Sequence, residues 1–328
     1  MKKFPAFRIY SDQQNTRAGI EQLSLDDLAE GDVVIRVKYS SVNYKDALAG
    51  TGKAQILRRS PLVGGIDLAG EVVESVSNDF VQGDQVIVNG SGLSEIHDGG
   101  YAEFARVPAD WVVPLPSGLT LVQAMIIGTA GFTAALSIHL LQQNNQQIDD
   151  GPIVVTGASG GVGSFAIDLL SKLGFETIAV TGTKDAYDYL YELGASKVVS
   201  REKIQIDDGV LEKTRWAGAI DNVGGDTLSA LVRACKPWGN VVSVGIAGGV
   251  KFKLSAMPFI IRGVNLLGVS SSNCPQPLRK KIWNRLGDDM HPEHIAKIKT
   301  QTISLENLPD IFEKLLNNET QGRALVEI

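Results

Sequence analysis

Val154-Val155-Thr156-Gly157-Ala158-Ser159-Gly160-Gly161-Val162-Gly163 is the stretch that most clearly indicates the fold of this chain. Ile153 to Val155 form a short apolar run that suits a buried parallel strand, and Phe165 to Leu170 follow with apolar residues at helical spacing. Small residues between a strand and a helix let the backbone approach a pyrophosphate, which free N–H groups and the helix dipole would bind. The stretch therefore predicts a dinucleotide-binding turn, with a purely structural turn as the alternative.

Strands and helices alternate along the chain after this turn. We expect strands at 177–180, 197–200, 217–222, 240–245 and 264–269, and helices at 186–193 and 228–235. A repeating strand–helix series is typical of a doubly wound, mostly parallel sheet. Residues 123 to 264 are therefore predicted to form a Rossmann domain.

The first 120 residues or so carry a different pattern. Strands are expected at 33–40, 68–76, 85–88 and 101–107, with turn residues and no crossover helices between them. This pattern indicates an antiparallel β unit. Two helices should follow at 122–126 and 133–141, and two more at 278–286 and 308–316. A last strand at 323–328 should return to the first domain, so that residues 1–122 and 265–328 form one domain.

Composition narrows the classes of partner. The formal net charge of −6 gives no broad basic surface, so we expect no nucleic-acid partner. The two cysteines, Cys235 and Cys274, are too few for a disulfide framework or a thiolate zinc site. No apolar run reaches membrane-spanning length, and no apolar segment follows Lys2-Lys3 as in a signal peptide. We therefore expect a cytoplasmic protein without membrane association.

The end of the second expected strand indicates which dinucleotide binds. In a typical NAD site an acidic residue at this position binds the ribose 2′-hydroxyl. Here Thr181, Gly182, Thr183 and Lys184 precede the first carboxylate, and two hydroxyls with an ammonium suit a 2′-phosphate. Arg201 follows the third strand on the same edge and could bind that phosphate or stack on adenine. NADPH is predicted rather than NADH, although Lys184 could also be a solvated charge at a helix start.

Over essentially its whole length the chain resembles the medium-chain dehydrogenase/reductase superfamily. Besides the glycine turn, the likeness rests on Gly64-Gly65-Ile66-Asp67-Leu68-Ala69-Gly70-Glu71-Val72. That superfamily pairs a GroES-like catalytic domain with a Rossmann domain. The resemblance thus implies an α/β protein with a GroES-like antiparallel β catalytic domain and a doubly wound parallel Rossmann sheet.

The zinc ligands of the alcohol dehydrogenases in that superfamily are not matched. Ile66 stands in place of the zinc-binding histidine and Asn43 in place of the first cysteine, while Gly128 to Thr133 lies near the third ligand. Asn89 to Gly100 contains no cysteine cluster for structural zinc. The histidines also lack ligand spacing; they are His97, His139, His291 and His294. We therefore expect a zinc-independent protein with no metal site.

Two stretches, Ser40 to Ala47 and Gly64 to Gly70, resemble the acryloyl-CoA reductase branch, whose members are also called quinone oxidoreductases. The resemblance places Tyr44 beside the nicotinamide and the segment containing Ser270 close to it. It also implies a phosphate site at the glycine turn, made of Ser159, Gly160, Gly161 and Val162, and a 2′-phosphate site at Thr181 to Thr183. Val264 to Val269 resembles the strand through which such enzymes pair two Rossmann sheets, so a homodimer is expected.

The predicted chemistry is hydride transfer without a metal. A conjugated thioester or enone is already electrophilic at its β-carbon, so it needs a positioned hydride donor, stabilisation of the enolate and a proton. Tyr44, Asn43 and Asp67 are the candidate catalytic residues. Tyr44 could position the nicotinamide and donate a proton, Asn43 could hydrogen-bond the carbonyl, and Asp67 could orient a neighbouring group. Each could instead have only a structural role.

Three hypotheses for the function follow. The first is NADPH-dependent reduction of an activated C=C bond, most simply acryloyl-CoA to propionyl-CoA. The second is an NADPH:quinone oxidoreductase, and the third a non-catalytic NADPH-binding protein. A CoA substrate would require basic residues for its phosphates; Arg58-Arg59 is a candidate, or equally an ordinary solvated loop.

Overall fold

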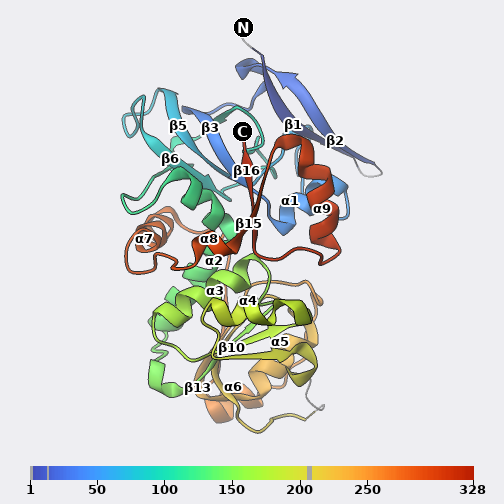
Figure 1. The fold of residues 1–328 in the computed structure, drawn as a ribbon, viewed down its shortest axis with the longest axis vertical. Helices are drawn as coiled ribbons and strands as arrows, with labels where there is room; N and C mark the ends of the chain where they lie inside the picture. Colours follow the sequence, from blue (N-terminus) through green and yellow to red (C-terminus); the bar gives the residue numbers. More distant parts are fainter. Residues whose placement is uncertain (1–2, 13–14, 205–208) are drawn as a thin grey trace. The chain divides into compact units, whose positions relative to one another are not determined.

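The computed structural model describes residues 3–12, 15–204 and 209–328 (Figure 1). They form two compact units. Unit 1 takes in Met1–Thr129, Ser271–Gly287 and Ile295–Ile328, and unit 2 takes in Ala130–Ser270 and Asp288–His294. The domain limits predicted from the sequence, at 122/123 and 264/265, stay a prediction.

Unit 1 is built mainly of antiparallel strands. Its larger sheet has the order β15-β16-β3-β5-β6-β8, with β7 also paired to β3, and its smaller sheet has the order β2-β1-β4. Only the pairing of β15 with β16 is parallel among these described strands. The strands are β1 Phe4–Ser11, β2 Thr16–Leu23, β3 Val33–Ser41, β4 Leu62–Val63, β5 Asp67–Ser75, β6 Gln85–Asn89, β7 Phe104–Val107, β8 Val113–Pro114, β15 Lys299–Ile303 and β16 Arg323–Glu327. The last strand lies beside β3, as expected for a chain that returns to its first domain.

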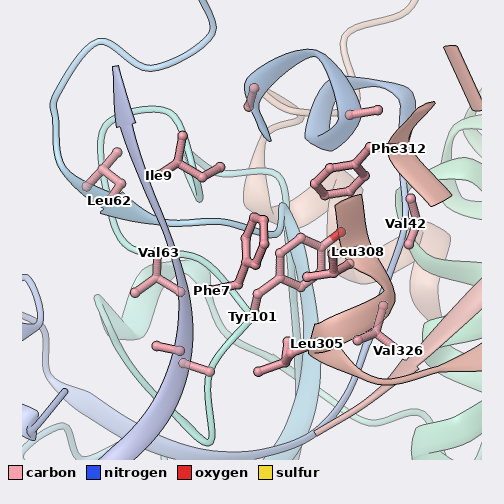
Figure 2. Close-up of a cluster of buried hydrophobic side chains, with 14 of the residues drawn as sticks. Phe7, Ile9, Val42, Leu62, Val63, Tyr101, Leu305, Leu308, Phe312 and Val326 are labelled. Atoms are coloured by element: carbon pink, nitrogen blue, oxygen red, sulfur yellow. The ribbon is translucent and has the colours of Figure 1, made fainter. Parts of the chain in front are cut away.

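Aromatic rings fill the centre of the core beneath the smaller sheet of unit 1 (Figure 2). Phe7 makes edge contacts with Tyr101 and Phe312, at ring-centroid distances of 6.3 and 5.9 Å. Phe312 lies on α9 (Leu308–Leu316), which packs on α1 (Tyr44–Thr51). Helix α1 was not expected from the sequence, and its apolar face is covered by this cluster. The remaining helices of unit 1 are α7 (Gln276–Leu286) and α8 (Ile295–Ile298).

Unit 2 contains the predicted Rossmann sheet. Its six strands are all parallel and follow the order β11-β10-β9-β12-β13-β14. They are β9 Ile153–Thr156, β10 Thr177–Thr181, β11 Lys197–Ser200, β12 Trp216–Asp221, β13 Cys235–Ser243 and β14 Asn265–Gly268. The chain order reverses between β9 and β12, and ligands of such sheets bind outside the carboxyl ends of the strands at that point. The helices are α3 (Gly161–Lys172), α4 (Tyr187–Glu192), α5 (Gly225–Arg233) and α6 (Met257–Arg262).

The span α2 (Leu121–Gln143) consists of two helical segments joined at a kink, in agreement with the two helices expected at 122–126 and 133–141. The expected break is present as one non-helical residue, Gly128, at φ 48° and ψ −157°. By length and composition alone α2 could cross a membrane, so the expectation that no apolar run reaches that length is wrong. Of its most apolar segment, 78% is buried inside the protein, as in the core helix of a globular fold.

Candidate functional site

The glycine turn of unit 2 has the conformation that its sequence predicts. Gly157 adopts φ 56°, and a Cβ on Gly163 would lie 2.3 Å from the Gly157 carbonyl oxygen, so both positions require glycine. Gly160 is exposed and caps α3, and a Cβ there would meet only that same oxygen, at 3.4 Å. Ser159, Gly161 and Val162 are half-buried around it. The backbone N–H groups at the start of α3 can therefore bind a phosphate.

The candidate 2′-phosphate residues lie together at the end of β10. The hydroxyl oxygens of Ser159 and Thr181 are 3.2 Å apart, and the Thr183 N–H donates to the Thr181 hydroxyl at 3.1 Å. A Cβ on Gly182 would lie 3.1 Å from the guanidinium carbon of Arg201, so this side chain from the next strand end covers Gly182. Gly182, Thr183, Lys184 and Arg201 are all exposed. The structure thus brings Arg201 to the strand tip that the sequence singled out.

The ends of β9 and β12 carry a polar cluster that sequence reasoning missed. The Thr156 hydroxyl donates to Asp221 at 2.6 Å, and the N–H groups of Val223 and Gly224 donate to the same carboxylate. The amide nitrogen of Asn222 donates to the Thr156 carbonyl at 2.8 Å. Burial raises the pKa of Asp221, and these donors oppose the rise. The signal in the sequence is an aspartate that ends an apolar strand, and the cluster lies at the reversal point of the sheet.

Ser270 lies at the opposite side of the same sheet. It follows β14, the edge strand, and is exposed. Two strands, β12 and β13, therefore lie between its own strand, β14, and β9, which leads into the glycine turn. Its predicted place near the nicotinamide stays a prediction.

Tyr44 is the first residue of α1 in unit 1. The residue is 47% exposed, so its ring is open to contact by a ligand. Asn43 precedes the helix, and its backbone N–H donates to the carboxylate of Asp46 at 2.9 Å, as in a capping box. The helix ends at Gly52, which is left-handed at φ 71°. Tyr44 is therefore exposed at the start of a helix whose first turn is held by the hydrogen bond between Asn43 and Asp46.

The carboxylate of Asp67 lies directly behind this helix start and is completely buried. One oxygen accepts hydrogen bonds from the Ser41 hydroxyl at 2.6 Å, the Asn43 amide at 2.8 Å and the Thr129 N–H at 2.8 Å. The other oxygen accepts from the Thr129 hydroxyl at 2.5 Å. Asn43 is only 8% exposed and also donates to Asp46. The structure thus joins Asn43 and Asp67, and it gives the Asn43 amide internal acceptors rather than an open position for a substrate carbonyl.

Arg323, the first residue of β16, completes this cluster and was not singled out from the sequence. Its side chain is 4% exposed. Every terminal nitrogen donates to a buried oxygen: Nε to the Ile126 carbonyl at 3.1 Å, Nη1 to the Val42 carbonyl at 2.7 Å and the Asn43 amide oxygen at 3.2 Å, and Nη2 to the Ser41 hydroxyl at 2.7 Å. Nη2 also lies 3.9 Å from the Asp67 carboxylate. We call Arg323, Asp67, Asn43, Ser41 and Asp46 the buried charge cluster.

Gly128 lets α2 approach the buried charge cluster. A Cβ on this residue would lie 2.6 Å from the Asp67 carboxylate and 2.8 Å from Arg323 Nη2. The helix break at Gly128 also frees the Thr129 N–H and hydroxyl for Asp67. The glycine predicted to interrupt the helix is therefore required by the ion pair beside it.

Burial shifts the pKa values of the charges in the cluster. The pKa of Asp46 rises from 3.8 to about 7, first because of burial and second because of the nearby Asp67 charge. Burial also raises the pKa of Tyr101, whose hydroxyl donates to the Ser41 carbonyl at 3.0 Å. Burial lowers the pKa of Arg323, which Asp67 opposes.

The residues at this position do not fit a zinc ion. Asn43, Ile66 and Asp67 offer one carboxylate, an amide and no thiolate or imidazole, and the Arg323 guanidinium already lies 3.9 Å from that carboxylate. Two cations so close together in a buried site would repel each other. Within the described part of the chain, no three His, Cys, Asp or Glu side chains form a metal-binding group.

The comparisons with known proteins identify the family. The model of the "Alcohol dehydrogenase GroES-like domain" matches residues 29–117, and that of the "Zinc-binding dehydrogenase" matches residues 161–286. The chain is 46% identical over 313 residues to "Probable acrylyl-CoA reductase AcuI" of Escherichia coli, covering 95% of this chain and 96% of that protein. The chain belongs to the medium-chain dehydrogenase/reductase family. The likeness to the acrylyl-CoA reductase group, inferred from the two motifs, is confirmed.

Two further relatives of this dehydrogenase/reductase have been solved with a bound nucleotide, one with NAD and one with NADP. "Putative quinone oxidoreductase YhfP" of Bacillus subtilis is 43% identical over 328 residues, 99% of each chain; its crystal structure with NAD bound has a TM-score of 0.97 and covers 100% of each chain. The yhdH oxidoreductase of Salmonella enterica, solved in complex with NADP, is 44% identical with a TM-score of 0.95 over 99% of each chain. These structures confirm the predicted α/β fold.

Proposed function

We propose that this enzyme uses NADPH to reduce an activated C=C bond, with acryloyl-CoA, converted to propionyl-CoA, as the substrate of choice. The observation that carries the proposal is the make-up of this site: Asn43 and Ile66 stand where metal-dependent relatives have zinc ligands, and the Arg323 guanidinium lies 3.9 Å from the Asp67 carboxylate. Without a Lewis acid at that position, simple ketones and alcohols are poorly polarised, whereas an enoyl thioester is electrophilic by itself. The name of the Escherichia coli relative points to the same substrate.

Unit 2 supplies the groups that fit NADPH. The start of α3 and the open backbone at Gly160 fit the pyrophosphate. Thr181, Thr183 and Arg201 fit the 2′-phosphate, because hydroxyl and N–H donors lie beside an exposed guanidinium and no carboxylate occupies the strand tip. Lys184 adds a further positive charge. Bound NADPH would supply the hydride for the β-carbon of the substrate.

Unit 1 supplies positioning and the proton. Tyr44 is the only one of the three candidate catalytic residues with a substantially exposed side chain, so we assign it contact with the nicotinamide and substrate. Its hydroxyl is a candidate donor of the proton that reaches the α-carbon. Asn43 and Asp67 are buried and bonded to each other, so we assign them positioning of Tyr44 rather than substrate contact.

A nearby carboxylate partly neutralises Arg58, the candidate residue for binding a CoA phosphate. The Arg58 side chain is 75% exposed, but its Nε lies 3.1 Å from Glu95, which also pairs with Lys45. Arg59 is exposed as well. A CoA phosphate would therefore compete with Glu95 for Arg58, and Arg59 is the freer candidate.

We also propose a cytoplasmic homodimer. The edge strand β14 has no neighbour on its outer side among the described strands. Apolar side chains are exposed on the preceding helix α6, where Ile260 and Ile261 are 74% and 62% accessible. Pairing of β14 with a second copy would satisfy the edge and cover α6. Light scattering behind a sizing column tests this directly: a monomer at micromolar concentration would contradict it.

Quinone reduction is the second candidate, favoured by the name of the Bacillus subtilis relative. Steady-state assays with NADPH against acryloyl-CoA and a panel of quinones separate the two activities. We expect a kcat/KM for acryloyl-CoA at least tenfold above that for any quinone. Turnover of quinones alone would overturn the first proposal, and tight NADPH binding without turnover of either class would favour a non-catalytic protein.

A further inference from the structure

The guanidinium of Arg323 holds the residues around the start of α1. It donates to the carbonyl of Val42, to the side chain of Asn43 and to the hydroxyl of Ser41. These three residues are consecutive and lead directly into Tyr44. No other side chain among those described makes as many hydrogen bonds to this segment, so Arg323 is its main anchor.

The same guanidinium balances the charge behind the segment. Asp67 accepts its hydrogen bonds from neutral donors, and Arg323 is the cation that lies against it, at 3.9 Å. The Ser41 hydroxyl connects the two, because it accepts from Arg323 and donates to Asp67. A planar fork of donors is needed for this arrangement, since Nη1 and Nη2 bond to different residues.

We propose that Arg323 is a positioning residue: its buried guanidinium fixes Ser41 to Asn43 and thereby the place of Tyr44. This inference rests on the proposed function for its effect on catalysis. It assigns Arg323 no contact with substrate or cofactor, because the side chain is 4% exposed and its donors are directed at protein oxygens.

The clearest test compares Arg323→Lys with a matched control, Arg106→Lys. Arg106 lies on β7 in the same unit and bonds to the Gly31 carbonyl, away from α1. Lysine keeps the charge at position 323 but cannot make the forked hydrogen bonds. A third variant, Ser41→Ala, removes only the connecting hydroxyl and serves if Arg323→Lys does not fold.

Two readouts are measured on each full-length variant. Hydrogen exchange should accelerate at least tenfold at the amides of α1 in Arg323→Lys, less in Ser41→Ala and not in Arg106→Lys, with the amides of α3 unchanged. With the best acceptor of the wild-type enzyme, kcat should fall at least tenfold in Arg323→Lys while the KM for NADPH stays within twofold. Addition of methylguanidinium to Arg323→Ala should restore part of kcat, whereas sodium chloride should not.

The outcomes distinguish a failure of the Arg323 proposal from a failure of the proposed function. Unchanged exchange at α1 in both Arg323→Lys and Ser41→Ala would overturn the proposal, as would faster exchange at α1 with an unaltered kcat. If the wild-type enzyme reduces neither acryloyl-CoA nor a quinone, the proposed function fails, and the exchange data still decide whether Arg323 anchors α1.

Discussion

The buried charge cluster of unit 1 and the ends of β10 and β11 in unit 2 differ in how their charged groups meet water. In unit 1 the buried charge cluster is shielded from water, and its donors and acceptors bond to one another. In unit 2 the groups that follow β10 and β11, Gly182 to Lys184 and Arg201, are exposed. A satisfied buried cluster rigidifies its surroundings and cannot bind a ligand directly, whereas an exposed set of donors can. The first therefore serves positioning, and the second binding.

Replacing Asp67 by asparagine should give the largest effect and should act on stability. The Arg323 guanidinium would lose its anion, and breaking a buried ion pair costs about 3–5 kcal/mol. We expect the free energy of unfolding to fall by that order in urea titrations. Asp79→Asn, an exposed aspartate of the same unit, should change it by less than about 0.5 kcal/mol. A small loss in Asp67→Asn would show that the ion pair is dispensable.

Gly163→Ala should disturb the glycine turn. The added Cβ would lie 2.3 Å from the Gly157 oxygen and 2.6 Å from the Ala158 Cα, both backbone atoms that cannot rotate away. Overpacking of this kind costs about 1–3 kcal/mol. The affinity for NADPH, followed by its fluorescence, should also fall at least tenfold. Gly19→Ala, where a Cβ meets nothing within 4 Å, is the control; equal behaviour of both variants would contradict the assignment.

Thr181→Asp should change nucleotide preference, and because Thr181 is only 4% exposed the added carboxylate should also lower stability. A carboxylate beside the Thr183 N–H would repel a 2′-phosphate but leave a 2′-hydroxyl tolerated. The Kd for NADPH should rise at least tenfold, and that for NADH by less than threefold. Thr181→Val removes the hydroxyl without adding charge. Its Kd for NADPH should lie between those of the wild type and Thr181→Asp. An equal loss of affinity for NADPH and NADH would contradict the assignment of the 2′-phosphate site to Thr181.

Asp46→Asn should alter the pH dependence of stability. The pKa of Asp46 is raised from 3.8 to about 7, mainly by burial and then by Asp67. The folded protein therefore keeps a proton that the unfolded chain has lost, and the stability from this group falls as pH rises from about 4 to 7. The wild type should lose stability across that window more steeply than Asp46→Asn, by at most about 1.4 kcal/mol per pH unit. Parallel curves, with Asp79→Asn as control, would contradict the shift.

Unit 2 was largely predictable because its determinants are local. Most of its strands contain a short apolar run, and the glycine turn leads into α3, so spacing alone indicates the sheet. In unit 1, β1 and β2 escaped prediction because polar residues interrupt their apolar positions, and Thr16–Leu23 has one buried residue, Leu23. Helix α1 escaped because it has only eight residues.

The residues of the candidate site also differ in how far the local sequence predicts them. Thr181 to Lys184 could be placed from the strand that they end, whereas Arg323 could not be connected to Asn43, from which 280 residues separate it. A charged residue at the start of an apolar strand was the available signal. Only the pairing of β16 with β3 brings it to Ser41 and Asn43.

The central claim is tested most directly by following a labelled hydride. The protein is incubated with acryloyl-CoA and NADPH deuterated at C4, and the thioester product is analysed by mass spectrometry. The account predicts propionyl-CoA with one deuterium at the β-carbon and, at the α-carbon, a new proton that derives from solvent. Formation of no propionyl-CoA, by an enzyme that still oxidises NADPH with a quinone, would contradict it.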